Sequence, residues 1–247
     1  GEEVSDLKVG DEVFVFSPIS EQGAYADYLA VDAGLVVAKP KTLNFVESAA
    51  VPLAALTAWQ GLLNDGQLKA GQRVLIHNAA GGVGSFAVQI AKHLGATVIA
   101  TASGKNESYV RSLGADEFID YQTQDFEEAF YKGDKVDKVD LVFAAVGGNH
   151  ILQRSLQVIR SGGRLVSTFD EMPQSEAENH NILFKRMWVQ PSGPDLSKIA
   201  ALIDESKIRV HLDSVYPLEH VQQAHLRSES QRAVGKIVLN LNSSIIG

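Results

Sequence analysis

The 247-residue chain contains no cysteine, and this absence excludes a disulfide, a thiolate nucleophile and a cysteine-ligated zinc ion. It also lacks a long apolar run: the longest, near residues 53–63, is interrupted by Thr57 and Gln60, whereas a bilayer span needs about 20 predominantly apolar residues. Basic residues are in the minority, 22 against 30 acidic ones, which gives a net charge of −8. We therefore expect no membrane span, and no nucleic-acid partner, since binding to a phosphate backbone depends on Lys and Arg.

The sequence also lacks a motif for metal-dependent or nucleophilic hydrolysis. Its seven histidines are dispersed without an H-E-x-x-H motif, and His220 and His225 lie five residues apart, a spacing that does not place two ligands on one helix face. No G-x-S-x-G element is present. We therefore expect no metal site, and the sequence leaves the catalytic residues unassigned.

Short apolar runs rich in Val, Ile, Leu and Phe alternate with helix-patterned stretches from residue 72 onward. The runs are Arg73–His77, Thr97–Thr101, Glu117–Tyr121, Asp140–Val146, Arg164–Phe169 and Met187–Gln190. Most are apolar on both faces, as in parallel strands that helices cover on both sides. Alternation of such strands with helices builds right-handed crossovers. The sequence therefore predicts an α/β fold with a doubly wound, six-stranded parallel sheet.

Two helices between these runs have the clearest patterns. Apolar residues at helical spacing predict a helix over residues 83–94, and Gly95 provides its C-terminal stop. A second pattern predicts a helix from its N-cap, Asn149, to Gly162. Each helix connects two of the predicted strands, as the doubly wound arrangement requires.

The two ends of the chain have a different pattern. They contain β-rich or helical segments at residues 8–16, 23–37, 218–228 and 236–241. Neither end is long enough for a core of its own, since fewer than about 40 residues rarely fold without outside help. We therefore expect residues 1–48 and 208–247 to form one small domain, into which a nucleotide domain of residues 49–207 is inserted.

A glycine-rich segment follows the first predicted strand. Residues 78–84 read Asn-Ala-Ala-Gly-Gly-Val-Gly, a G-x-G-x-x-G motif from Ala79 onward with alanine in place of the first glycine. Small residues let the backbone approach a pyrophosphate, and the N-terminus of the next helix stabilises its charge. The strand–loop–helix context favours dinucleotide binding over a tight structural turn. The expected binding residues are Ala80, Gly81, Gly82 and Val83.

The end of the second strand bears on the choice of dinucleotide. An NAD enzyme usually carries Asp or Glu there, where it binds the ribose 2′-hydroxyl. This chain instead has Ser103 and Lys105, and its next carboxylate, Glu107, falls inside the following helix. A hydroxyl and a lysine suit a 2′-phosphate as donor and point charge. We therefore expect NADP(H) rather than NAD(H), with a solvated surface lysine as the alternative interpretation of Lys105.

Eight short motifs together resemble those of a known family. They are residues 7–13 (Leu-Lys-Val-Gly-Asp-Glu-Val), 23–28 (Gly-Ala-Tyr-Ala-Asp-Tyr), 50–59 (Ala-Val-Pro-Leu-Ala-Ala-Leu-Thr-Ala-Trp), 79–84 (Ala-Ala-Gly-Gly-Val-Gly), 113–116 (Leu-Gly-Ala-Asp), 146–148 (Val-Gly-Gly), 162–166 (Gly-Gly-Arg-Leu-Val) and 235–239 (Gly-Lys-Ile-Val-Leu). In this order and spacing the chain resembles the medium-chain dehydrogenase/reductase superfamily, specifically its zinc-independent quinone oxidoreductase and enone (2-alkenal) reductase branch, related to zeta-crystallin. The resemblance implies a Rossmann domain inserted in a GroES-like β-barrel domain whose N-terminal part is missing here.

The resemblance also implies further cofactor contacts. Thr57 would approach the cofactor where the two domains meet, Tyr121 would face the adenosine 2′-phosphate, and Arg232 would reach the cofactor phosphates. The residues that end the fourth and fifth strands face the cofactor crevice by the carboxyl-end rule for open sheets; they are Val146, Gly147, Thr168 and Phe169. The alternatives are structural: a threonine packed under Trp59, a partly buried tyrosine, plain strand ends and a surface arginine.

In this branch, hydride passes from C4 of NADPH to a quinone or to the electrophilic carbon of an α,β-unsaturated carbonyl compound. The resemblance therefore implies an NADPH-dependent, zinc-free reductase of a small molecule. Two alternatives are an NADP(H)-binding structural or sensing protein without turnover, and an excised enoyl-reductase module of a larger synthase. One departure is that the fourth strand, which commonly ends in Asp-Ser or Asp-Thr, here ends in Ala144-Ala145, which removes hydrogen-bonding groups beside the crevice.

Two expectations concern assembly and location. We expect a homodimer through the sixth strand, because a strand at the sheet edge offers an unpaired backbone to a two-fold partner. Met187 and Trp188 would help to bury that contact. The sequence shows no secretory leader, so we expect a cytoplasmic location, with an upstream targeting segment as the alternative.

Overall fold

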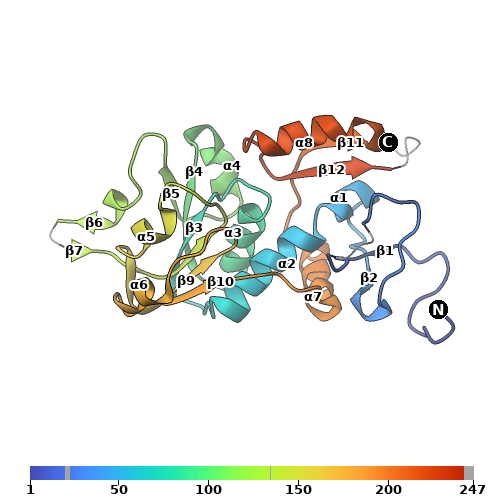
Figure 1. Ribbon diagram of the computed structural model, residues 1–247, viewed down its shortest axis with the longest axis horizontal. Coiled ribbons are helices and arrows are strands. Elements are labelled where there is room, and N and C mark those ends of the chain that lie inside the picture. The colour runs from blue at the N-terminus through green and yellow to red at the C-terminus, as the bar shows by residue number, and fades with distance from the viewer. Residues whose placement is uncertain (20–22, 134, 242–247) are drawn as a thin grey trace. The chain divides into compact units, whose positions relative to one another are not determined.

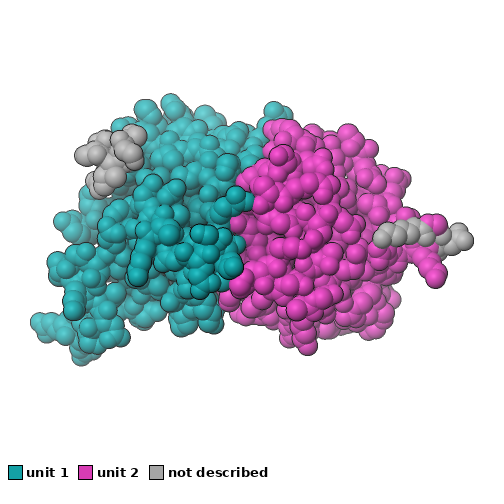
Figure 2. All heavy atoms as spheres, turned by 180° about the vertical axis from the view of Figure 1, so that it is seen from behind, with its two compact units in different colours: residues 1–56, 190–247 teal, residues 57–189 magenta. Residues whose placement is uncertain are grey.

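The computed structural model describes residues 1–19, 23–133 and 135–241. The chain forms two compact units, coloured separately in Figure 2: unit 1 is Gly1–Leu56 with Gln190–Gly247, and unit 2 is Thr57–Val189. Unit 2 is shorter than the expected domain of residues 49–207. Its C-terminal limit is earlier because α7 (Gly193–Asp204) packs on η1 (Ala33–Leu35) and β2 (Val37–Ala38), both in unit 1.

In the part of the chain that the structure describes, unit 2 is built on a six-stranded sheet in the order β10-β9-β8-β3-β4-β5. Figure 1 labels five of these strands, β3, β4, β5, β9 and β10. The strands are β3 (Arg73–His77), β4 (Thr97–Ala102), β5 (Glu117–Asp120), β8 (Val139–Ala144), β9 (Ile159–Ser167) and β10 (Leu183–Arg186). All neighbouring pairs run parallel. The predicted doubly wound, six-stranded parallel sheet is therefore confirmed.

Short helices cover both faces of this sheet. They are α3 (Gly84–His93), α4 (Glu107–Ser112), α5 (Ile151–Ser155) and α6 (Gln174–Glu178). α3 packs on β3 and β4, α4 on β4 and β5, α5 on β8 and β9, and α6 on β10. Because the two halves of the sheet extend in opposite directions from the β3–β8 pair, right-handed crossovers place α3 and α4 on one face and α5 and α6 on the other.

Two predicted elements depart furthest from the structure. The sixth strand was expected at Met187–Gln190, whereas β10 is Leu183–Arg186 and pairs Leu183 with Arg164. The helix expected from Asn149 to Gly162 ends at Ser155, and its N-cap is His150, which has a φ of +51°. The residues from 159 onward are strand instead, and Gly162 marks an irregular register in β9 rather than the end of a helix.

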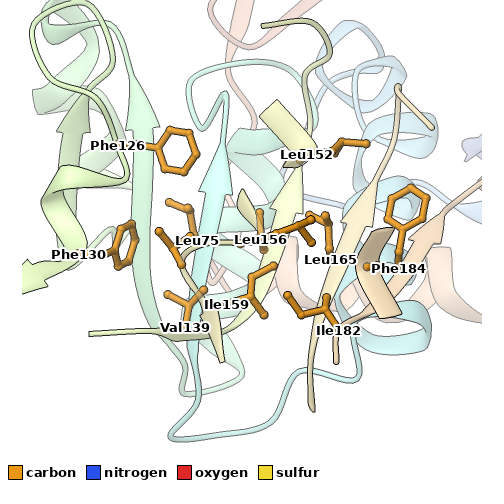
Figure 3. Packing of buried hydrophobic residues seen from close by; sticks show 14 of the residues in the cluster. Leu75, Phe126, Phe130, Val139, Leu152, Leu156, Ile159, Leu165, Ile182 and Phe184 are labelled. Carbon is orange, nitrogen blue, oxygen red and sulfur yellow. The ribbon is translucent and has the colours of Figure 1, made fainter. Parts of the chain in front are cut away.

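The core of unit 2 lies between the sheet and the helices on its α5 face. Figure 3 shows Leu75, Val139, Ile159 and Leu165 grouped around the central strands, with Phe126 and Phe130 at one side and Ile182 and Phe184 at the other. The central strands β3, β4 and β8 are buried on both faces along most of their length. This continuous apolar layer fixes the strand ends at which a dinucleotide would bind.

Unit 1 is built from short elements that pair over long sequence distances. β1 (Val13–Phe14) pairs antiparallel with β2, and β11 (Leu212–Pro217) pairs parallel with β12 (Lys236–Asn240). α8 (Val221–Glu229) connects β11 to β12 and packs on both. The expected tail helix and last strand are thus present, whereas β11 was not predicted. The assignment of the two ends to a GroES-like barrel stays a prediction.

The remaining elements are α1 (Phe45–Ala49), α2 (Pro52–Gln60), the π-helical turn η2 (Gly61–Asp65), η3 (Gly104–Asn106), η4 (Glu128–Phe130), β6 (Tyr131–Lys132), β7 (Lys135–Val136) and η5 (Leu218–His220). α1 begins with a capping box in which the side chains of Asn44 and Glu47 bind each other's backbone N–H. None of the helices in the described ranges is long and apolar enough to cross a bilayer.

Candidate functional site

The loop between β3 and α3 has a backbone that a phosphate group can approach. It starts at Asn78, which has a φ of +57°, and the carbonyl oxygen of Asn78 accepts a hydrogen bond from the N–H of Gly81 (3.0 Å). A Cβ on Gly84 would lie 2.1 Å from that carbonyl oxygen, so a side chain at this position would collide with backbone. The N–H of Ser85 donates a hydrogen bond to the carbonyl oxygen of Gly81 (2.9 Å), so the first turn of α3 follows directly on this closely folded loop.

The four loop residues predicted for pyrophosphate binding lie in this turn. Ala80 and Gly81 are buried, and Gly82 and Val83 are half-buried. A Cβ on Gly81 would lie 2.7 Å from Nδ2 of Asn78, so this glycine leaves room for the asparagine side chain. The loop thus has the small residues, the tight turn and the helix N-terminus that a dinucleotide requires, and the residues present fit that group.

This loop lies where the strand order of the sheet reverses. β4 and β5 continue the sheet on one side of β3, and β8, β9 and β10 continue it on the other. In open α/β sheets, ligands bind in the crevice outside the carboxyl ends of the strands at such a point. Asn78 Nδ2 donates a hydrogen bond to the carbonyl oxygen of Ala145 (3.1 Å), which links the phosphate loop to the end of β8. Sequence reasoning gave Asn78 no role, although asparagine's tolerance of positive φ was a signal.

The residues expected at the 2′-phosphate follow β4 and β5, which are neighbours in the sheet. The N–H of Tyr121 donates a hydrogen bond to the carbonyl oxygen of Ala102 (3.3 Å), next to Ser103. Ser103 is buried and its Oγ accepts a hydrogen bond from Asn106 Nδ2 (3.1 Å). Lys105 is exposed in η3, and the Tyr121 side chain is 60% exposed. The structure therefore brings these segments to one edge and leaves a lysine and a phenol open to a ligand.

A carboxylate that the sequence analysis did not single out lies at the same edge. A Cβ on Gly104 would lie 2.4 Å from Oδ2 of Asp120, so the carboxylate packs against the backbone between Ser103 and Lys105. Asp120 Oδ1 accepts a hydrogen bond from the N–H of Gln122 (3.0 Å), which fixes the turn after β5. An anion bound here would meet this negative charge, and the positive charge of Lys105 would offset it.

The residues expected to face the crevice follow β8 and β9. The N–H and Oγ1 of Thr168 donate hydrogen bonds to the carbonyl oxygen of Ala144 (3.1 and 3.3 Å), so the two strand ends are tied together. The Phe169 side chain is 69% exposed, and its carbonyl oxygen accepts a hydrogen bond from Arg186 Nε (3.0 Å). Val146 and Gly147 are half-buried. These four residues therefore sit at neighbouring carboxyl ends, as the strand rule predicts.

The two remaining predicted contacts come from α2 and from unit 1. Thr57 lies in α2 and is buried, with 7% of its surface exposed. Arg232 belongs to unit 1, where its carbonyl oxygen accepts a hydrogen bond from Arg227 Nη2 (3.2 Å) and its N–H donates to Ser230 Oγ (3.3 Å). The cofactor roles of both residues stay predictions.

A buried histidine lies directly before the phosphate loop. His77 ends β3, its Nδ1 is 3.1 Å from Thr101 Oγ1, and its Nε2 is 3.2 Å from Ser155 Oγ. Its ring meets that of Phe126 edge-to-face at 4.7 Å. Burial, assisted by the charge of Arg154 and opposed by that of Glu127, lowers the pKa of His77 to about 3. The side chain is therefore a neutral link between β3, β4 and α5, a role that the sequence did not indicate.

The described residues contain no group of three or more His, Asp or Glu side chains that could hold a metal ion. The side chains of Asn78, Ser103 and Thr168 instead follow the carboxyl ends of β3, β4 and β9. The arrangement can bind and orient an elongated, anionic ligand across these strand ends.

Comparison with known proteins identifies the family. Residues 113–239 match the sequence profile of a family described as zinc-binding dehydrogenase. A probable zinc-binding oxidoreductase, mitochondrial, from Arthroderma benhamiae is 33% identical, and the match covers 96% of this chain and 75% of that protein. This chain belongs to the zinc-binding dehydrogenase family. The resemblance to the medium-chain dehydrogenase/reductase superfamily is thereby confirmed.

Two further proteins are similar to this chain in sequence or in fold. An NADPH-dependent alkenal/one oxidoreductase, chloroplastic, from Arabidopsis thaliana is 36% identical, with 97% of this chain matched. The chain spans about 60% of the length of that relative. The structure of a quinone oxidoreductase from Coxiella burnetii superposes with a TM-score of 0.88 at 30% identity, covering 98% of this chain and 75% of that one. Both the fold and the branch expected from the sequence motifs thus have counterparts among known proteins.

Proposed function

We propose that this chain is part of an NADPH-dependent, zinc-free reductase of quinones or α,β-unsaturated carbonyl compounds. The observation that carries the proposal is the closed turn at Gly84, which places a loop of small residues and the N-terminus of α3 at the switch point of the sheet. The printed names of the Arabidopsis and Coxiella relatives, an alkenal/one oxidoreductase and a quinone oxidoreductase, support the substrate class. When bound, NADPH would supply the hydride for the reduction.

The residues of this chain then have distinct tasks. Ala80, Gly81, Gly82 and Val83 form the loop of small residues along which the backbone approaches the pyrophosphate. Ser103 and Lys105, with Tyr121 beside them, bind the 2′-phosphate, and Lys105 offsets the carboxylate of Asp120. Val146, Gly147, Thr168 and Phe169 orient the other end of the dinucleotide. Thr57 and Arg232 are proposed as further contacts. Holding donor and acceptor in one orientation contributes roughly 7–11 kcal/mol to such a transfer.

A parallel titration with NADPH and NADH tests the binding half of this proposal, and addition of an enone or a quinone, followed at the absorbance of the reduced nicotinamide, tests the chemistry. NADPH-selective binding followed by oxidation supports a reductase. Selective binding without turnover supports the alternative of an NADP(H)-binding structural or sensing protein. Binding and reduction of an enoyl thioester in preference to free enones would support the third interpretation, an enoyl-reductase module.

The Lys105→Ala variant tests the cofactor preference. It should weaken NADPH binding about tenfold, the loss expected for a hydrogen bond to a charged group, and should change NADH binding by less than about twofold. Lys69→Ala is the matched control, because Lys69 is also exposed and in unit 2 but precedes β3 at the opposite edge of the sheet. Equal effects of Lys105→Ala on the two nucleotides would contradict the assignment of the 2′-phosphate site.

The assembly and the compartment belong to the same proposal. We infer a homodimer through β10, which ends the sheet and carries the exposed Leu183, with the exposed Trp188 just beyond it. Met187 does not contribute as expected, because it is buried inside unit 2 against Gly61. A monomeric mass by light scattering at micromolar concentration would contradict this interface. A cytoplasmic location stays a prediction.

A further inference from the structure

The segment that follows β8 is held by two side chains from different parts of unit 2. On one side, Asn78 Nδ2 donates a hydrogen bond to the carbonyl oxygen of Ala145 (3.1 Å). On the other, the N–H of Gly148 donates a hydrogen bond to Oδ2 of Asp170 (2.6 Å). Asn78 follows β3 and Asp170 follows β9, so residues 145–148 are fixed from both neighbouring strands of β8.

The side chain of Asp170 lies closely against the backbone of Gly147. A Cβ on Gly147 would lie 2.5 Å from Oδ1 of Asp170 and 2.5 Å from Cδ1 of Phe169. The carboxylate therefore packs against the backbone of Gly147 while it binds the N–H of Gly148. Gly148 itself has a φ of +82°, which a side chain would strain. Gly147 is thus explained by the side chains of Asp170 and Phe169, and Gly148 by its backbone conformation.

Asp170 is itself well placed by its neighbours. Thr168 is bound to the carbonyl oxygen of Ala144 through its N–H and its Oγ1. The carbonyl oxygen of Phe169 accepts a hydrogen bond from Arg186 Nε at the end of β10. The backbone that carries Asp170 is therefore anchored to β8 and to β10, and the carboxylate presents a fixed acceptor to the loop.

We propose that Asp170 is a positioning residue for the dinucleotide crevice, which acts through the N–H of Gly148 to fix residues 145–148. The proposal rests on the proposed function, because this loop carries two expected cofactor contacts, Val146 and Gly147. The last residue of β8 and the residue after it, Ala144 and Ala145, offer only alanine side chains, so the fixing groups come from the adjacent segments. A loop that is ordered before binding costs less entropy when the dinucleotide binds.

Three variants separate hydrogen bonding from charge. Asp170→Ala removes the acceptor, Asp170→Asn keeps an amide oxygen in its place without the charge, and Glu171→Ala removes the exposed neighbouring carboxylate as a matched control. Two quantities are measured: the hydrogen-exchange rate of the Gly148 amide in the free protein, by NMR, and the dissociation constant for NADPH. A steady-state assay with an enone then separates KM for NADPH from kcat.

We expect Asp170→Ala to speed exchange at Gly148 and to raise the Kd and KM for NADPH about tenfold with kcat little changed. Asp170→Asn should stay within about twofold of the wild type, because an amide oxygen also accepts a hydrogen bond. Glu171→Ala should match the wild type. If Asp170→Ala does not fold, Asp170→Ser, whose oxygen falls short of Gly148, takes its place.

Other outcomes overturn the assignment. Faster exchange in Asp170→Ala with an unchanged Kd would show that the bond supports the loop without positioning the dinucleotide. Equal losses in Asp170→Asn and Asp170→Ala would assign the effect to charge rather than to the hydrogen bond. A wild-type protein that binds neither NADPH nor NADH would instead reject the proposed function, whereas the exchange rates would still report whether Asp170 holds the loop.

Discussion

The strands of the two units differ in length and in burial. In unit 2, β3, β4 and β8 are buried on both faces, and the side chains on one of these faces belong to a continuous apolar cluster. In unit 1, β1 and β2 have two residues each, and large apolar side chains at Val9, Ile19 and Tyr28 are largely exposed. A strand that is buried on both faces can be recognised from its own run of apolar residues. The position of a two-residue strand depends mainly on the strand with which it pairs.

The strongest test of this difference replaces one aromatic residue in each unit. Phe143 in β8 is fully buried, so Phe143→Ala should lower the free energy of unfolding by about 3–5 kcal/mol. Tyr28 is 93% exposed, so Tyr28→Ala should change it by no more than about 0.5 kcal/mol. Guanidinium denaturation followed by circular dichroism measures both. Similar losses in the two variants would mean that Tyr28 packs in solution and that the contrast between the units is wrong.

A smaller effect is expected from a pair of glycines. At Gly84 an added Cβ meets the backbone carbonyl of Asn78, so Gly84→Ala should cost about 2–3 kcal/mol and distort the phosphate loop. At Gly23 in unit 1 an added Cβ meets nothing within 4 Å, so Gly23→Ala should be close to neutral. Calorimetry of both variants, together with NADPH titration, checks the stability and the binding. Normal NADPH affinity in folded Gly84→Ala would show that the loop is not the pyrophosphate site.

The sequence predictions were most accurate where a strand is buried on both faces. β3 has the predicted bounds, because three buried aliphatic residues, Val74, Leu75 and Ile76, mark a strand covered on both faces. The sixth strand was predicted too late in the chain. β10 lies at the edge of the sheet and has one neighbouring strand, so its residues alternate between buried and exposed. The apolar residues just after β10 therefore gave the stronger strand pattern in the sequence. Gly162 was interpreted as the end of a helix, although glycine is equally typical of an irregular strand.

Within the site, the sequence predicted residues whose role depends on local spacing. The phosphate loop follows its strand and precedes its helix, so Ala80 to Val83 could be found from the motif alone. Asn78 and Asp170 could not, because their partners, Ala145 and Gly148, are 67 and 22 residues away along the chain. Hydrogen bonds of this kind depend on strand order, which local periodicity does not specify.

The last and smallest expected effect concerns His77, the buried link between β3 and α5. Its pKa is about 3 in the folded chain against an ordinary value of 6.5 in the unfolded one. Above pH 6.5 both states are neutral, so the group does not change stability with pH. Between pH 6.5 and 3 the unfolded chain binds a proton that the folded chain does not, so stability falls as the pH falls, by up to about 1.4 kcal/mol per pH unit.

Replacement of the histidine by a side chain that does not titrate should remove this dependence. His77→Gln keeps polar atoms near Thr101 and Ser155 and leaves the nearby Arg154 and Glu127 in place, so their own contribution to the acid dependence is common to both proteins. Between pH 6.5 and 4.5 we expect the variant to lose about 2 kcal/mol less stability than the wild type, measured by denaturant titration at each pH. Parallel curves would mean that folded His77 takes up a proton, and the sheet would then tolerate a charge directly behind the phosphate loop.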